Sequence, residues 1–154
     1  MTVRFPGLVI ADWQTRLVHD HPRLFPDTRL VHTGDGPALS ASGWPAVPDG
    51  WRAIVETACR RLDAILAAEP DAELFIHDVK EKYGGLRLAV TEIGLSETAS
   101  AAMEQAVDLA EAHSFHVCEI CGGPGQLSQH RGWYATRCET HADAFVPVPG
   151  PREE

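Results

Sequence analysis

Two long stretches of the chain place apolar residues at the spacing of one helical face, and each predicts a helix. The first follows Asp49, a suitable N-cap, and ends at Pro70. Its apolar stripe consists of Trp51, Ile54, Val55, Ala58, Leu62, Ile65 and Leu66. The second covers about residues 97–113, after the N-cap residue Ser96. Its stripe consists of Ala99, Met103, Ala106, Val107 and Ala110.

Between these helices, two shorter stretches show the period of a half-buried strand or a continuous apolar run. Residues 74–79 and 86–91 are predicted to form a hairpin. Its turn is expected at Tyr83-Gly84-Gly85, because glycine tolerates the backbone angles of tight turns.

The N-terminal third has a weaker pattern. Residues 10–21 predict a short helix that ends at Pro22. Residues 22–48 contain five prolines and three glycines, so irregular structure is expected there. Apolar side chains within it are expected to pack on the core, namely Leu24, Phe25 and Trp44.

The clearest chemical signal is a pair of metal-ligand spacings near the C-terminus. Cys118 and Cys121 are separated by two residues, and so are Cys138 and His141, which follow after sixteen further residues. Thiolate and imidazole are the ligands that Zn²⁺ prefers in tetrahedral sites, and this spacing lets one turn present two of them. We therefore predict a structural zinc ion, because four protein ligands leave no position for water or substrate.

The residues around these ligands complete a small module. Residues 126–130 and 133–137 are predicted to form a hairpin about Arg131-Gly132, and the sequence after Cys138 favours a helix. A knuckle, a hairpin and a helix in this order describe a treble clef. Zinc would replace the hydrophobic core that a segment of about thirty residues cannot build alone.

Other interpretations of the Cys and His residues stay open. The cysteines could form disulfides, which a reducing cytoplasm disfavours, or the four residues could be unrelated. His113 or His116 could replace His141 as the fourth ligand. Cys59 lies beside the buried face of the first long helix and is expected to be a core residue.

A catalytic alternative depends on other histidines. A treble clef can carry a one-metal nuclease centre with a histidine on its hairpin, and His130 has that position. His77 and Asp78 could form an acid/base pair, although adjacent strand residues point to opposite faces. The segment from His19 to His21 lies near a helix end. None of these is a complete catalytic constellation, so a non-enzymatic protein is expected.

Charge excludes several partners. The 154 residues carry a net charge of -9, and residues 51–114 alone hold twelve acidic and six basic side chains. Such a surface repels phosphate backbones and favours a basic protein partner. The chain has no run of 18 apolar residues and no signal-peptide pattern, so we expect a cytoplasmic protein without membrane contact.

Two surfaces are candidates for contact with a basic partner. Four carboxylates share one face of the second long helix: Glu97, Glu104, Asp108 and Glu111. Glu92 and Glu119 extend this acidic stretch, which contains no lysine or arginine. Like charges at this spacing repel, and a basic partner would offset that repulsion; a solvated helix face is the alternative. The second surface is the hairpin tip, with Lys80, Lys82 and Arg87. A hairpin tip of alternating charge is usually a solvated turn with weak ion pairs, and that is the alternative.

Three segments also occur together in a recognisable arrangement. They are Asp49-Gly50-Trp51 at a helix start, VKEKYGGLR at residues 79–87, and CEICGGPG at residues 118–125 with Trp133 and the second ligand pair. On these segments, which span about residues 49–142, the chain resembles an uncharacterised family of small bacterial and phage proteins. That family typically has isoleucine and phenylalanine where this chain has Val79 and Tyr83. The resemblance implies a zinc-finger module docked on an α+β body, and it implies no known activity.

The sequence thus predicts an α+β fold with two main helices, a short antiparallel sheet and a C-terminal treble-clef-like zinc module. Residues 1–114 are expected to form the body, residues 115–145 the module packed on it, and residues 146–154 a disordered tail. The expected function is non-enzymatic binding of a basic protein, as an immunity protein or inhibitor masks a toxin or a nucleic-acid-acting enzyme. A hydrolase or nuclease that uses His130, or a phage or host adaptor protein, is the alternative.

Overall fold

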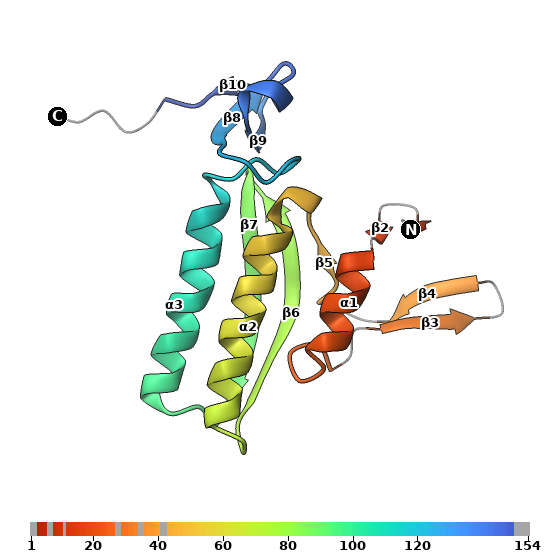
Figure 1. The fold of residues 1–154 in the computed structure, drawn as a ribbon, viewed down its shortest axis with the longest axis vertical. Coiled ribbons are helices and arrows are strands. Elements are labelled where there is room, and N and C mark those ends of the chain that lie inside the picture. Colours follow the sequence, from red (N-terminus) through yellow and green to blue (C-terminus); the bar gives the residue numbers. More distant parts are fainter. Residues whose placement is uncertain are drawn as a thin grey trace.

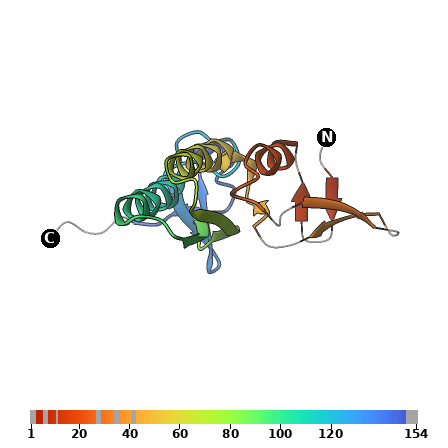
Figure 2. The same ribbon diagram turned by 90° about the horizontal axis from the view of Figure 1, so that it is seen from below.

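Two helices lie side by side on one face of a three-stranded sheet in the structure, which is a computed structural model (Figure 1). The helices are α2 (Arg52–Ala68) and α3 (Glu97–Ser114). The sheet has the order β5-β6-β7. In it, β5 (Pro45–Ala46) runs parallel to β6 (Glu73–Lys82), and β7 (Gly85–Ile93) runs antiparallel to β6. Figure 2 shows the helices in one layer and these strands in the other.

The structure describes residues 3–5, 8–10, 12–26, 29–33, 36–40 and 43–149. Helix α1 (Asp12–Asp20) lies beside α2 (Figure 2). Short antiparallel pairs are formed by β1 (Val3–Phe5) with β2 (Leu8–Ile10), and by β3 (Arg29–Thr33) with β4 (Gly36–Ser40). A 3-10 turn, η1 (Asp49–Trp51), leads into α2. These elements confirm the α+β class, and no helix among the described ranges has the length and apolar character to cross a membrane.

The C-terminal part forms a separate small sheet above the end of the main one (Figure 1). Its strand order is β10-β8-β9, and the strands are β8 (Gln126–His130), β9 (Trp133–Arg137) and β10 (Val146–Pro147). The predicted hairpin of strands 126–130 and 133–137 is confirmed. Between β9 and β10 lies a second 3-10 turn, η2 (Glu139–His141).

The turn between β6 and β7 confirms the predicted hairpin. Tyr83 and Gly84 have φ values of 53° and 87°, so both central residues adopt the left-handed conformation that matches the twist of a two-residue hairpin. The strands extend further than the sequence indicated, and a bulge between Ile76 and Asp78 shifts their register. The hairpin tip therefore lies beneath the small C-terminal sheet (Figure 1).

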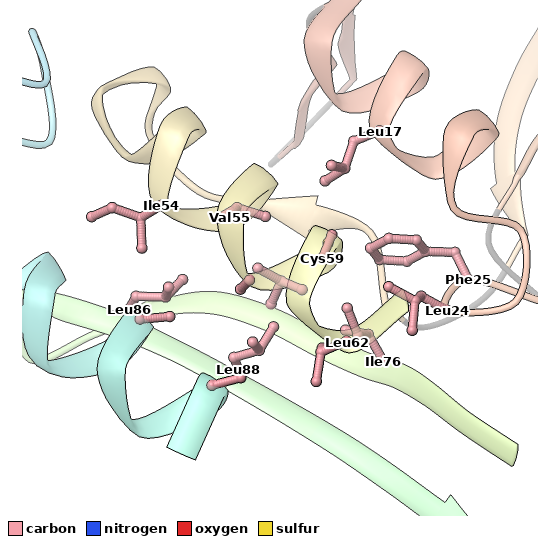
Figure 3. Close-up of a cluster of buried hydrophobic side chains, with 14 of the residues drawn as sticks. Leu17, Leu24, Phe25, Ile54, Val55, Cys59, Leu62, Ile76, Leu86 and Leu88 are labelled. Carbon is pink, nitrogen blue, oxygen red and sulfur yellow. The ribbon is translucent and has the colours of Figure 1, made fainter. Parts of the chain in front are cut away.

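One hydrophobic core joins the two layers. Figure 3 shows α2 at its centre, with Cys59 and Leu62 between the α1 side and the strands. Both side chains are fully buried, as are Trp51 and Val55. Leu24, Phe25 and Trp44 are buried as predicted. The core cluster of the described residues contains no side chain beyond position 110, with only Val117 packed at its margin.

Helix α3 also covers the free edge of the sheet. The backbone N–H of Leu86 donates to Ser114 Oγ at 2.8 Å, and the N–H of Leu88 donates to Glu111 Oε1 at 3.1 Å. Edge strands expose unpaired backbone groups that invite other strands, and these two bonds satisfy such groups in β7. The Ser96 cap at the other end of α3 is confirmed, since its Oγ accepts the Ala99 N–H at 3.2 Å.

Three predictions about local structure were wrong. Asp49 does not cap α2: its carboxylate accepts a hydrogen bond of 2.8 Å from Trp13 Nε1, because α1 lies against the start of α2. Residues 22–48 are not wholly irregular, since they contain β3, β4 and β5. Proline is tolerated at the first position of a strand and at edges, as Pro45 at the start of β5 and Pro37 in the two-stranded pair illustrate.

The third error concerns the tail expected at residues 146–154. Val146 and Pro147 pair with Gln129 and Ser128 of β8, and the Val148 N–H donates to Leu127 O at 2.8 Å. The edge of β8 offers unpaired backbone groups to residues 146–148, and the composition of the tail does not indicate this pairing. Residues 150–154 lie outside the described residues.

Substitution of Leu62 tests the central place of α2 in the core. Because Leu62 is fully buried, L62A should lower the free energy of unfolding by about 2–5 kcal/mol. The matched control is Leu109 on α3, which is 49% exposed, and L109A should cost under about 1 kcal/mol. Urea denaturation measures both, and equal losses would contradict the assigned core.

Candidate metal centre

Three cysteines and one histidine converge in the C-terminal module. Cys118, Cys121, Cys138 and His141 each offer one donor atom, and these four atoms all lie within 4.8 Å of one another. The structure therefore brings together the four residues that the sequence predicted. Among the described residues, neither His113 nor His116 belongs to this cluster.

The spacing of the donor atoms suits a tetrahedral ion. The Cys121 and Cys138 sulfurs are 3.8 Å apart, and His141 Nδ1 lies 3.8 Å from the Cys118 sulfur and 3.2 Å from the Cys138 sulfur. Bonds of about 2.3 Å to sulfur and about 2.0 Å to nitrogen place tetrahedral donors roughly 3.5–3.8 Å apart. The donor set and its dimensions thus fit zinc.

The first ligand pair lies on a tight loop held by its own backbone. The Cys118 N–H donates to Gly123 O at 2.7 Å, and the Gly122 N–H donates back to Cys118 O at 2.9 Å. Gly122 has a φ of 78°, a conformation that glycine adopts without a side-chain clash. The Gly123 N–H points at the Cys121 sulfur, 3.4 Å away. The loop therefore aims both sulfurs at one point.

The second ligand pair lies at η2. Cys138 precedes this 3-10 turn, and the His141 N–H donates to Cys138 O at 3.2 Å. One turn of tight helix thus presents both donors on the same side. The helix expected after Cys138 is limited to this turn, and the chain then continues into β10.

Backbone groups favour the ionised form of one thiol. Burial opposes ionisation of Cys118, but N–H groups of Cys121, Cys138 and Ile120 directed at its sulfur outweigh that effect and lower its pKa to about 6. At Cys121 the Gly123 N–H favours the thiolate, yet burial and the neighbouring sulfurs raise the pKa above its ordinary value. A bound cation would remove this repulsion, because metals bind deprotonated thiols.

Arg137 connects the segments that carry the ligands. Its Nε donates to Glu119 Oε1 at 2.9 Å, and its Nη1 donates to the carbonyl of the ligand residue His141 at 3.0 Å. Its guanidinium also lies 5.1 Å from the centre of the Phe145 ring. Burial raises the pKa of Glu119, and the Arg137 guanidinium opposes that shift. The pair holds the Cys118–Cys121 loop against the strand that leads to Cys138.

Close backbone contacts dock this module on the body. The Gly50 N–H donates to Glu119 O at 2.9 Å, and the Trp51 indole donates to Val117 O at 3.0 Å. On the other side, Thr136 Oγ1 donates to Gly84 O at 2.7 Å in a buried bond. The three segments on which the family resemblance rests therefore meet at this junction.

Among the residues that the structure describes, no other histidine joins the metal centre. His130 packs edge-on against Phe145 with ring centres 5.8 Å apart. His77 bonds to Thr91 and not to Asp78, whose carboxylate pairs with Lys80 at 2.9 Å. His21 bonds to Asp63 and links the end of α1 to α2. Cys59 is fully buried, and desolvation raises the pKa of its thiol to about 12, as suits the expected core residue.

The predicted partner surfaces are two separate faces. Glu97, Glu104 and Asp108 are exposed on α3, whereas Glu111 is half-buried and bonds to β7. Lys80 and Arg87 are paired in register and alternate with buried residues that face the helices, so they lie on the open face of the sheet. Lys82 is exposed at the end of the same hairpin.

Sequence reasoning missed two features of the site. Glu119 was assigned to the acidic surface, yet it is 8% exposed and pairs with Arg137. Gly50 was read only as part of a motif, yet its backbone lies against that of Cys118 and Glu119 and leaves no space for a Cβ. The only sequence signal was that both lie in the segments of the resemblance, which does not say what they contact.

No protein-family model matches the chain, and neither does any curated protein or solved structure. What the site does therefore has to follow from its own residues.

Loss of one exposed ligand tests the metal assignment. Because the four donors form one site, C121S should reduce bound zinc from one ion per chain to a small fraction and lower the midpoint of thermal unfolding. The control is C59S, which should destabilise the core but retain zinc. Metal analysis of both purified variants gives the result, and unchanged zinc in C121S would refute the assignment.

A methyl group at Gly50 tests the junction. A Cβ there would lie 2.2 Å from Cys118 O and 2.4 Å from the Glu119 carbonyl carbon, both backbone atoms that cannot move independently. G50A should therefore lower the free energy of unfolding by about 2–4 kcal/mol and shift the Trp51 indole resonance. In the control G132A, the φ of 82° strains a residue with a side chain, but nothing lies within 4 Å of the added Cβ, so the Trp51 indole resonance should stay in place. A wild-type indole position in G50A would contradict the docking described.

Proposed function

We propose that the chain is a zinc-stabilised, non-enzymatic module that binds a basic protein. Zinc stabilisation is supported by the convergence of four protein donors at tetrahedral spacing. Catalytic zinc needs an open position for water or substrate, and a Cys₃His set fills all four. The zinc is accordingly structural, and it holds a treble-clef-like arrangement of knuckle, hairpin and short turn.

The need for a structural ion follows from the composition of the module. Of the module's described apolar side chains, Cys118 and Ala135 are the buried ones, and Cys118 is itself a proposed ligand. Small segments without a core gain their folding free energy from metal ligation. Zinc therefore contributes the stability that burial supplies in the body.

The acidic face of α3 supports the second half of the proposal. Glu104 and Asp108 are one helical turn apart and exposed, and Glu97 lies on the same side. No ion pair to lysine or arginine is found for these three among the described residues. With a net charge of -9, such a face attracts a basic surface and accelerates association with it.

A basic cleft that binds nucleic acid is the partner surface that this charge fits best. Enzymes acting on DNA or RNA place lysines and arginines along the phosphate path. An acidic helix laid on that path blocks it, as an immunity protein or inhibitor does. The exposed Lys80, Lys82 and Arg87 lie on another face and would make, at most, a separate contact.

Charge reversal on α3 tests this function. The wild-type chain is used to isolate a partner from its native host at low salt, and intact mass identifies it. E104K/D108K should then weaken binding to that partner by about tenfold or more and flatten its salt dependence, because two attractive charges become repulsive. The control D71K/E73K changes the net charge equally at exposed positions off α3 and should change affinity far less.

Two outcomes would count against the proposal. One is an affinity and salt dependence of E104K/D108K equal to those of the wild type. The other is a zinc-loaded chain that captures no partner at low salt.

A further inference from the structure

A cleft of about 620 Å³ opens where the metal module meets the body. One wall is formed by residues 46–49, from β5 to η1, and the opposite wall by β9. In Figure 1, β5 lies on the side of the sheet away from α3, and β9 lies above the end of the sheet. The volume of the cleft lies within the range of about 300–1,000 Å³ that is typical of ligand sites.

The cleft carries excess negative charge. Asp49, Glu81 and Glu119 contribute carboxylates, and Arg137 contributes the cation in its lining. Arg137 is already paired with Glu119 at 2.9 Å and has Asp143 at 3.6 Å. Asp49 accepts a hydrogen bond from the Trp13 indole at 2.8 Å, and Glu81 accepts one from the Gly84 N–H at 2.6 Å. Among the described residues neither carboxylate makes an ion pair, so both lack a cationic partner.

Two exposed aromatic side chains line part of the cleft. Trp133 is 75% exposed, the highest value among the large apolar side chains described, and Tyr134 beside it is 38% exposed. Nothing in the packing of the module requires a tryptophan at this position, because the core cluster does not reach β9. Exposed tryptophan and tyrosine at a hollow are typical of partner-binding positions.

We propose that this cleft receives an arginine side chain from an extended segment of a partner protein. Asp49 and Glu81 provide carboxylate acceptors for its guanidinium, and Trp133 and Tyr134 provide faces on which the planar cation stacks. Apolar side chains, including Val47 and Phe145, line the path of its methylene groups.

The chemistry selects this occupant over others. Phosphate groups of nucleic acid are repelled by the uncompensated carboxylates. A purely apolar segment would desolvate those carboxylates without a partner for them. Lysine offers a point charge, whereas arginine combines stacking with forked hydrogen bonding. No residue of α3 lines the cleft, so the inference does not rest on the proposed α3 surface.

Two blocked tripeptides test the proposal on the zinc-loaded full chain. Acetyl-Gly-Arg-Gly-amide should shift the Trp133 indole resonance and the backbone amides of residues 46–49 and 133–135 in a saturable manner. The same peptide with citrulline, the neutral isostere of arginine, should bind about tenfold more weakly, because it lacks the charge.

Variants locate the site. E81Q and W133L should each weaken binding of the arginine peptide by about threefold or more. Both replace exposed side chains, and the glutamine of E81Q keeps an oxygen that can accept the Gly84 N–H, so the fold should persist. The control E73Q removes an exposed carboxylate elsewhere and should bind as the wild type does. E104K/D108K should also retain peptide binding, which separates this site from the α3 surface.

The proposal is overturned if no saturable shift occurs below about 10 mM peptide. It is equally overturned if the citrulline peptide binds as well as the arginine peptide, or if E81Q and W133L both match E73Q. Shifts confined to α3 would assign the peptide to general charge attraction and overturn it too.

Discussion

The convergence of three thiols and one imidazole is the constraint on which the C-terminal third depends. Residues beyond 117 add no side chain to the hydrophobic core among the described residues, so burial alone cannot hold their three strands and two loops. The donors come from two turns that are sixteen residues apart, joined by a hairpin. An ion bound by all four donors would connect both turns and restrain the hairpin between them. Arg137 connects the same segments by pairing with Glu119 and with the His141 carbonyl.

The junction between the metal module and the body depends on close approach at two glycines. Gly50 lies against the carbonyl of Cys118, and Gly84 lies against Ala135 and Leu127, so backbone meets backbone on both sides of the module. Hydrogen bonds from the Gly50 N–H to Glu119 O and from Thr136 Oγ1 to Gly84 O then cross the junction at the two glycines. This explains in physical terms why the helix start, the hairpin tip and the metal loops form one unit.

Sequence reasoning succeeded where the determining interactions are local. The stripes of α2 and α3, the Ser96 cap, the glycine turn of β6 and β7 and the ligand spacing each depend on residues within a few positions of one another. It failed where distant residues decide. Asp49 bonds to Trp13 instead of capping α2. Glu119 forms an ion pair with Arg137, and residues 146–147 pair with β8. For Glu111, helical periodicity could place the residue on α3, but it could not predict that its carboxylate accepts the Leu88 N–H.

X-ray absorption at the zinc edge of the purified full chain tests the metal centre most directly. A structural Cys₃His site predicts three sulfur neighbours at about 2.3 Å and one nitrogen neighbour at about 2.0–2.1 Å, with no light-atom ligand beyond these four. A protein that carries no zinc, or a spectrum with water or two or more oxygen or nitrogen neighbours, would contradict the closed site and with it the structural role of the metal.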